Sequence, residues 1–173
     1  MNVNREYRSP NYNPEQIEVE FVVLHHTAGD LKTTLAWFED PESQVSAHLV
    51  IDAEGDTYEI VPCWDGTTQR AWHAGQSSWT DADDHWQKFN DFSIGIELVN
   101  LNGNTHPYTD QQYDALVAVI GHLRSLYPAL DSPARIVGHQ HIAGNRGKTD
   151  PGKLFDWERL FSECYPGQDA PSR

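Results

Sequence analysis

Two nearly unbroken apolar runs are the strongest pattern along the chain. Residues 17–26 contain valine, leucine and phenylalanine almost in succession and end in the polar sequence HHT. Residues 93–99 (SIGIELV) form a second run, which has an acidic residue, Glu97, inside it. Apolar runs of this length are typical of strands that are buried on both faces of a sheet. We therefore predict two central strands here.

Shorter patterns predict the other strands. Residues 48–52 and 57–61 flank the turn sequence Glu54-Gly55, which indicates a β-hairpin. Residues 135–139 (RIVGH) have the composition of a short strand. The sheet would then have strands from both halves of the chain.

Helical spacing follows each of the two central runs. Leu31, Leu35 and Phe38 recur at helical intervals and predict a short helix that Pro41 stops. A longer helix is predicted where Thr109 and Gln112 form a capping-box pattern before Pro128. Its apolar positions lie on one face, namely Tyr113, Leu116, Val117, Ile120 and Leu123. A last helix is predicted near residues 155–161.

The remaining segments have no clear period. Residues 1–16 are polar and predict an N-terminal arm that wraps the domain, and residues 166–173 a C-terminal tail. Residues 76–91 and 140–153 are predicted to be loops. Strands that alternate with helices predict an α/β fold, with a central mixed β-sheet flanked by helices in a single domain over residues 1–173.

Composition narrows the classes of partner. The hydrophobic content is 38% and the charged content 22%, which suits a soluble globular domain. The formal net charge of -14 disfavours binding to nucleic acid and to anionic lipid. No apolar run is long enough to span a membrane, and no secretory signal is visible, so we expect no membrane insertion and a cytoplasmic location. Export that needs no signal peptide remains open.

The chain has two cysteines, Cys63 and Cys164. They lie far apart and form no C-x-x-C pair, so we expect two free thiols rather than a disulfide. Nothing in the sequence indicates an obligate interface, and we expect a monomer.

Histidines and one aspartate follow the predicted strands. His25 and His26 end the first central strand, His139 ends another, and Asp150 lies in a tight KTDPG turn. Strand ends at one edge of an open α/β sheet are where ligand-binding groups collect. Two histidines and one carboxylate would make a three-ligand zinc site with a fourth position open for water, although Mn, Co and Fe accept the same donors.

Each of these residues also has a purely structural interpretation. A histidine after a strand is commonly only a polar residue at the chain's exit from the core, and Lys148 alone would be a solvated surface lysine. Glu97 differs, because an ionised carboxylate in an apolar strand needs a partner or a raised pKa. The residues alone therefore predict a metal-dependent hydrolase and leave its substrate open.

Five groups of segments resemble the type-2 N-acetylmuramoyl-L-alanine amidase family, which includes phage lysozyme-type amidases and peptidoglycan recognition proteins. They run in the family's order over roughly residues 20 to 157. The segments are VVLHHTA (22–28), VSAHLVI (45–51), RAWHAG (70–75), NDFSIGIEL (90–98), and VGH (137–139) with KTDPG (148–152). The resemblance is greatest to the bacterial cell-wall recycling branch, in which Asp replaces Cys as the third zinc ligand.

The resemblance implies a role for each matching residue. His25, His139 and Asp150 would bind one zinc ion. Glu97 would act as general base on the zinc-bound water, and Lys148 would stabilise the oxyanion of the tetrahedral intermediate. The implied activity is hydrolysis of the amide bond between N-acetylmuramic acid and L-alanine in peptidoglycan or (anhydro)muropeptides.

Three further residues are expected to bind substrate, namely His73, Trp72 and His26. Core packing beside Trp72 is an equally good interpretation of His73. The segment between His139 and Lys148 is one residue longer than the usual family spacing. This departure makes His141 a possible substitute ligand.

Two other functions remain open at this stage. A non-catalytic peptidoglycan-recognition module would keep the fold and the cleft, but such members usually lack a zinc ligand. A zinc peptidase would cut within the stem peptide instead. The sequence leaves open whether the substrate is intact peptidoglycan or a 1,6-anhydro fragment, and whether the role is in recycling or that of a phage enzyme or toxin.

Overall fold

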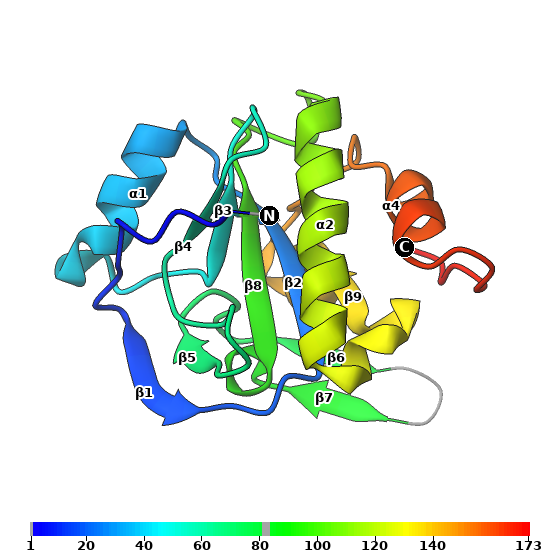
Figure 1. Ribbon diagram of the computed structural model, residues 1–173, viewed down its shortest axis with the longest axis horizontal. Coiled ribbons are helices and arrows are strands. Elements are labelled where there is room, and N and C mark those ends of the chain that lie inside the picture. Colours follow the sequence, from blue (N-terminus) through cyan, green and yellow to red (C-terminus); the bar gives the residue numbers. More distant parts are fainter. Residues whose placement is uncertain (1, 81–83) are drawn as a thin grey trace.

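One mixed β-sheet forms the centre of the computed structural model, which describes residues 2–80 and 84–173 (Figure 1). Its strand order from edge to edge is β4 (Thr57–Glu59), β3 (Leu49–Ile51), β8 (Ser93–Leu98), β2 (Phe21–His26) and β9 (Ile136–Gly138). β3 and β4 are antiparallel, and the three other neighbouring pairs are parallel. The predicted α/β fold with a central mixed sheet is confirmed.

The two central strands, β2 and β8, pair along six residues each. Val22 and Leu24 contribute to the core on one face of the sheet, whereas Phe21 and Val23 contribute to the core on the other. The prediction that β2 is buried on both faces is therefore confirmed, and the strand begins at Phe21. The hairpin predicted around Glu54-Gly55 is also present as β3 and β4.

One face of the sheet is covered by α2 (Asp110–Leu126), which packs beside α4 (Trp157–Cys164) (Figure 1). The predicted capping box is present. The Thr109 hydroxyl accepts from the Gln112 backbone N–H at 3.1 Å, and the Gln112 side-chain oxygen accepts from the Thr109 N–H at 3.1 Å. The apolar face of α2 is buried as its spacing predicts.

The opposite face carries shorter elements. α1 (Leu31–Glu39) begins at Asp30, whose carboxylate accepts from the Thr33 N–H, and packs Leu35 and Phe38 into a separate core cluster. The helix ends two residues before Pro41, as expected from the missing N–H of proline. α3 (His139–Ala143) lies against β9 and β2.

The prediction of a loop over residues 76–91 is wrong in part. β6 (Ser78–Thr80) and β7 (His85–Gln87) form an antiparallel pair with Trp79 opposite Trp86, while the part of this prediction that covers residues 81–83 lies outside the described residues. Strands of three residues that lie on the surface are too short for a hydrophobic alternation to stand out.

The predicted N-terminal arm and the predicted loop over residues 140–153 also contain regular structure. The N-terminal arm contains β1 (Tyr12–Gln16), which pairs with β5 (Gln69–Ala71), so the arm is held by a ladder. The prediction of a loop over residues 140–153 is wrong at its start, because residues 140–143 belong to α3 and Gly144–Arg146 form a 3-10 turn. A five-residue helix has too few turns to produce a periodic pattern.

Cys63 and Cys164 are both buried and free, as expected. The C-terminal tail folds back, and the Arg173 guanidinium donates to the carbonyls of Ile136 (3.0 Å) and Ala134 (2.9 Å). Within residues 2–80 and 84–173, no helix has the length and apolar content needed to cross a membrane.

Candidate metal centre

A cavity of about 460 Å³ opens where the central strands β2 and β8 end. This volume lies within the range of small-molecule sites in proteins. Its lining includes all the residues expected to bind the metal, act in catalysis or bind substrate: His25, His26, Trp72, His73, Glu97, His139, Lys148 and Asp150. Residues more than 120 positions apart in sequence are thus brought to one place.

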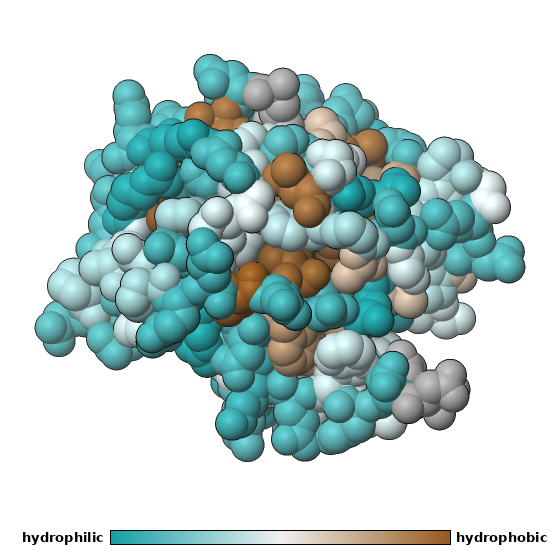
Figure 2. Space-filling view, turned by 60° about the horizontal axis from the view of Figure 1, so that its bottom comes forward, coloured by the Kyte–Doolittle hydropathy of each residue, from teal (hydrophilic) through white to brown (hydrophobic). Residues whose placement is uncertain are grey.

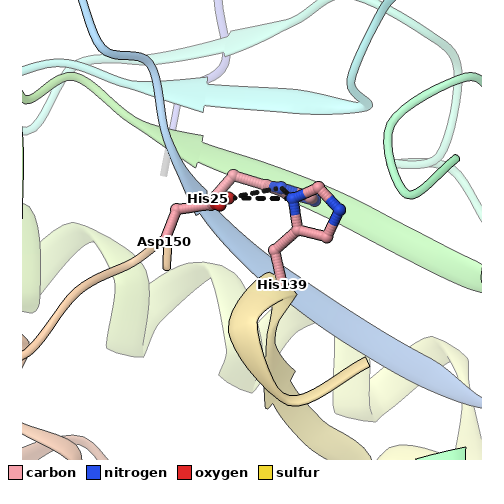
Figure 3. Close-up of side chains that lie close together, drawn as sticks. All are labelled: His25, His139 and Asp150. Carbon is pink, nitrogen blue, oxygen red and sulfur yellow. Dashed lines mark hydrogen bonds and ion pairs between the residues drawn. The ribbon is translucent and has the colours of Figure 1, made fainter. Parts of the chain in front are cut away.

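Three donor atoms converge inside this cavity (Figure 3). His25 Nδ1 lies 3.2 Å from His139 Nδ1, and Asp150 Oδ2 lies 3.0 Å and 3.1 Å from these two nitrogens. A tetrahedral zinc ion with bonds of about 2.0–2.1 Å holds its ligand atoms about 3.3 Å apart. The triangle therefore fits three ligands of one such ion, and all three residues that would hold the ion line the cavity.

The protons of the imidazoles support the same interpretation. His139 Nε2 lies 3.1 Å from the Ala74 carbonyl oxygen, which can only accept, so Nε2 carries the hydrogen. In the neutral ring, Nδ1 then presents a lone pair to the centre of the triangle. Burial, followed by the proximity of His139, lowers the pKa of His25 to about 4, so this ring is neutral at neutral pH.

Asp150 supplies the negative charge of the cluster. Burial raises the pKa of this carboxyl, but its contacts with His139 and His25 outweigh that effect and hold the pKa well below its usual range. Lone pairs from three atoms that meet at 3.0–3.2 Å repel one another unless a proton or a cation lies between them. The donor set suits zinc, because imidazole nitrogen and carboxylate oxygen are among its usual ligands.

The loop that carries Asp150 is fixed by backbone contacts. The Asp150 carbonyl accepts from the Gln140 N–H at 2.9 Å, and the Tyr108 hydroxyl donates to the Pro151 carbonyl at 2.6 Å. Gly152 has φ +95°, and a Cβ there would lie 2.4 Å from the backbone of Gly103. The turn after Asp150 therefore requires glycine, and its tight packing holds the third donor in place.

Glu97 lies beside the cluster, since it pairs directly with His25 across β2 and β8. Its Oε2 atom is buried and has no hydrogen-bond partner among the described residues. Burial, with a smaller contribution from Asp150, raises the pKa of Glu97 to about 8, and the positive charge of Lys148 partly opposes this. A carboxyl group that exchanges its proton near neutral pH is suited to acid–base chemistry.

The other lining residues differ in how they are held. Lys148 is exposed at the cavity, while the indole N–H of Trp72 donates to the Asn13 side chain at 2.7 Å. The Nδ1 atom of His26 is buried without a hydrogen-bond partner in the described part of the chain. His73 has a second role besides lining the cavity, because its Nδ1 lies 3.0 Å from Nε2 of His25.

His141 lies outside the triangle of donor atoms. Its Nδ1 accepts from the Gly138 N–H at 2.8 Å, and its ring packs beside that of Trp157. This histidine therefore caps the start of α3, and the substitute-ligand alternative has no support in the geometry.

Sequence reasoning missed the residues that support the site from behind. Ser93 and Gly95 share the face of β8 that carries Glu97, and Asn90 accepts from the N–H groups of His73 (3.1 Å) and Ala74 (2.7 Å). A signal was present, because small or polar residues alternate with Ile, Ile and Leu in the sequence SIGIEL. That period of two indicates a strand with one apolar face and one functional face.

The comparisons with known proteins point to one family. A family profile described as N-acetylmuramoyl-L-alanine amidase matches residues 14–153. The 1,6-anhydro-N-acetylmuramyl-L-alanine amidase AmpD of Enterobacter cloacae is 45% identical over 125 residues, which cover 72% of this chain and 60% of that protein. The N-acetylmuramoyl-L-alanine amidase AmiD of Escherichia coli is 34% identical over 155 residues, covering 84% of this chain and 53% of AmiD. The chain thus spans less than two thirds of the length of these two relatives.

Solved structures show the same fold. The crystal structure of a selenomethionine derivative of AmpD superposes with a TM-score of 0.75 at 34% identity and covers 93% of both chains. A structure of Escherichia coli AmiD with the substrate anhydro-N-acetylmuramic acid-L-Ala-D-gamma-Glu-L-Lys has a TM-score of 0.71 at 30% identity. It covers 91% of this chain and 61% of that one.

Proposed function

The chain belongs to the N-acetylmuramoyl-L-alanine amidase family, and from this premise we propose that it is a zinc-dependent hydrolase of the amide bond between N-acetylmuramic acid and L-alanine. The observation that carries the proposal is the convergence of three donor atoms at 3.0–3.2 Å beside a buried glutamate in one cavity. A recognition module without chemistry would need neither the complete donor set nor the buried acid.

In this proposal His25, His139 and Asp150 hold one Zn²⁺ ion. A bound Zn²⁺ polarises an amide carbonyl and lowers the pKa of a water molecule toward about 7. The protein's contribution is a fixed set of donors with a side open to the cavity, together with acid–base and cationic groups around that side.

Glu97 is proposed to move the proton. Its carboxylate would take a proton from the attacking water and return it to the departing alanine nitrogen. In the metal-free protein the raised pKa of about 8 means that Glu97 holds a proton tightly, which suits the return of the proton to the departing nitrogen. A cation bound beside Glu97 would lower this pKa and so favour the carboxylate form that accepts the proton from water.

Lys148 is proposed to stabilise the transition state. Its ammonium group lines the same cavity, where it can donate to the oxygen of the amide as negative charge develops there. Single donors in such positions contribute about 3–4 kcal/mol in other hydrolases.

For the substrate we propose 1,6-anhydro-muropeptides. The support comes from the relatives: AmpD carries that substrate class in its name, and the AmiD structure holds an anhydromuramic acid tripeptide. The cavity lining also includes the exposed Trp37 and Val45 together with Trp72, which offer apolar contact to a sugar ring or an alanine methyl group.

The test is mass spectrometry of muropeptides after incubation with the protein, with and without a strong chelator. We expect release of the free stem peptide that begins at L-alanine, its loss on chelation, and its recovery with Zn²⁺. Anhydro and reduced muropeptides run in parallel would establish the preferred sugar.

Two results would contradict the proposal. Binding of muropeptides by zinc-loaded protein with no product would favour the recognition module. Fragments whose masses show cleavage within the stem peptide would favour a zinc peptidase.

A further inference from the structure

We propose that His73 is a positioning residue for the metal centre, which directs the Nδ1 lone pair of His25 at the ion by accepting a hydrogen bond from the opposite ring nitrogen. The inference rests on the zinc site of the proposed function. His25 Nε2 lies 3.0 Å from His73 Nδ1, and the two ring planes make an angle of 86°.

The direction of this hydrogen bond follows from the far side of His73. Its Nε2 lies 3.4 Å from the Ser93 carbonyl and 3.3 Å from the Ser93 hydroxyl. The carbonyl can only accept, and the hydroxyl already donates to the Phe89 carbonyl at 2.5 Å. Nε2 of His73 is therefore the donor.

A neutral imidazole carries one hydrogen, so one ring nitrogen donates and the other accepts. Because Nε2 of His73 carries the hydrogen, its Nδ1 is an acceptor, and Nε2 of His25 must donate to it. Nδ1 of His25 is then left without a hydrogen, in the form that a metal ligand needs. A partner on the second nitrogen of a ligand histidine is a common feature of metal sites and fixes both tautomer and ring orientation.

The strand β8 is shaped to receive this ring. A Cβ at Gly95 would lie 2.4 Å from Cγ of His73, so any larger residue would displace the ring. Gly95 is the glycine in the middle of an otherwise buried strand, where glycine commonly marks the close approach of another group.

The backbone of His73 is held as firmly as its ring. The His73 N–H donates to the Asn90 side chain at 3.1 Å, and the neighbouring Trp72 N–H donates to the Ser46 hydroxyl at 2.9 Å. Nδ1 of His73, the acceptor for His25, is thus held in place through contacts of both the ring and the backbone of His73.

His48 provides a matched control. Its ring lies 5.6 Å from the ring of His73, but its Nε2 donates to the Gln69 carbonyl and its Nδ1 accepts from the Gly95 N–H. Both nitrogens are occupied by backbone groups, so His48 has a structural role and no bond to a ligand histidine.

The first experiment measures zinc affinity by competition with a chromogenic chelator, in the absence of substrate. We expect His73→Leu to weaken zinc binding by about 10–100-fold. His73→Asn should stay within a few-fold of wild type, since its side-chain oxygen can take the place of Nδ1, and so should His48→Asn. Unchanged affinity in His73→Leu, or an equal loss in His73→Leu and His48→Asn, would overturn the proposal.

A second measurement needs no variant and so does not depend on whether a variant folds. Long-range ¹H–¹⁵N correlation spectra of the zinc-loaded protein report which ring nitrogen carries hydrogen. We expect the Nε2–H form for both His25 and His73, and a hydrogen on Nδ1 of His73 would contradict the proposal. Neither measurement uses amidase turnover, so failure of the proposed reaction would be seen separately, as zinc-loaded protein that yields no product.

Discussion

Glu97 shows at the scale of one residue how burial changes the proton affinity of a candidate active-site group. The residue is partly exposed, yet its Oε2 atom is buried without a hydrogen-bond partner among the described residues. The resulting pKa of about 8 lies well above the ordinary value of 4.5. The group thus gains acid–base reactivity near neutral pH at the expense of stability.

The cost to stability can be measured in chelated protein. Between pH 4.5 and about 8 the folded state holds the Glu97 proton more tightly than the unfolded state, so the free energy of unfolding falls as pH rises. Glu97→Gln removes this loss. The free energy of unfolding of the variant, relative to that of wild type, should therefore be several kcal/mol higher at pH 9 than at pH 5, as each pKa unit corresponds to about 1.4 kcal/mol. Urea unfolding of both proteins at pH 5 and at pH 9 measures these free energies. If the variant and wild type differ by the same amount at both pH values, Glu97 does not titrate in this range.

The same substitution should have the opposite effect on turnover. Glu97→Gln keeps the shape of the side chain but cannot accept a proton, so we expect turnover to fall by about 10²–10⁴-fold while zinc stays bound. Muropeptide cleavage and zinc content are measured on the same preparation. Wild-type turnover in this variant would remove Glu97 from the mechanism.

Lys148 allows a second test with a matched lysine. Lys148→Met removes the proposed donor at the cavity and should lower kcat by about 10²–10³-fold, with zinc affinity little changed. Lys153→Met serves as the control, because Lys153 is exposed five residues away and does not line the cavity. Equal kcat values for the two variants would mean that Lys148 does not act on the transition state.

At the scale of elements, β8 combines two functions in six residues. Ile94, Ile96 and Leu98 face the core under α2, while Ser93, Gly95 and Glu97 alternate with them. The same strand therefore anchors the sheet and supports the candidate metal centre. This division is a direct consequence of side chains pointing to opposite faces of a strand.

The capping box of α2 gives a prediction at this scale. Thr109→Ala removes the acceptor for the Gln112 N–H and also the donor to the Ala53 carbonyl at 2.7 Å. We expect a loss of about 1–2 kcal/mol in the free energy of unfolding by urea. Thr67→Ala, at an exposed loop position, should change it by less than about 0.5 kcal/mol. If the two losses are equal, the cap does not stabilise the helix.

At the scale of the whole molecule, the candidate metal centre joins distant parts of the chain. His25 is the last residue but one of β2, His139 begins α3, and Asp150 follows α3 in a loop. The face of the molecule in Figure 2 is mainly hydrophilic, as expected for a formal net charge of -14. With this charge, negatively charged substrates must be attracted by local groups such as Lys148 and the proposed zinc ion.

A bound ion at such a junction should stabilise the folded protein. At free zinc of about 100 times Kd the gain is about 2.7 kcal/mol, which corresponds to an increase in Tm of roughly 5–10 °C for a chain of this size. Thermal unfolding with zinc and with chelator measures this difference. Asp150→Ala should abolish it, and a zinc-induced increase that persists in this variant would place the ion elsewhere.

The sequence by itself determined the sheet, the main helices and the identity of the candidate site residues. Long apolar runs, a capping box and polar residues at strand ends are local signals, because each is a pattern within a few neighbouring positions of the chain. The segments that resemble the amidase family are also recognisable in the amino-acid sequence. The elements β1, β5, β6, β7 and α3 were not predicted, since three to five residues without a continuous apolar run show no clear period.

Only the tertiary structure decided how these residues act on one another. The 3.0–3.2 Å triangle of donors, the raised pKa of Glu97 and the bond from His25 to His73 depend on distances between residues 11 to 125 positions apart. The sequence left His73 between substrate binding and core packing. Its contact with a candidate zinc ligand exists because β8 has no side chain at Gly95, a fact of packing that no local pattern contains.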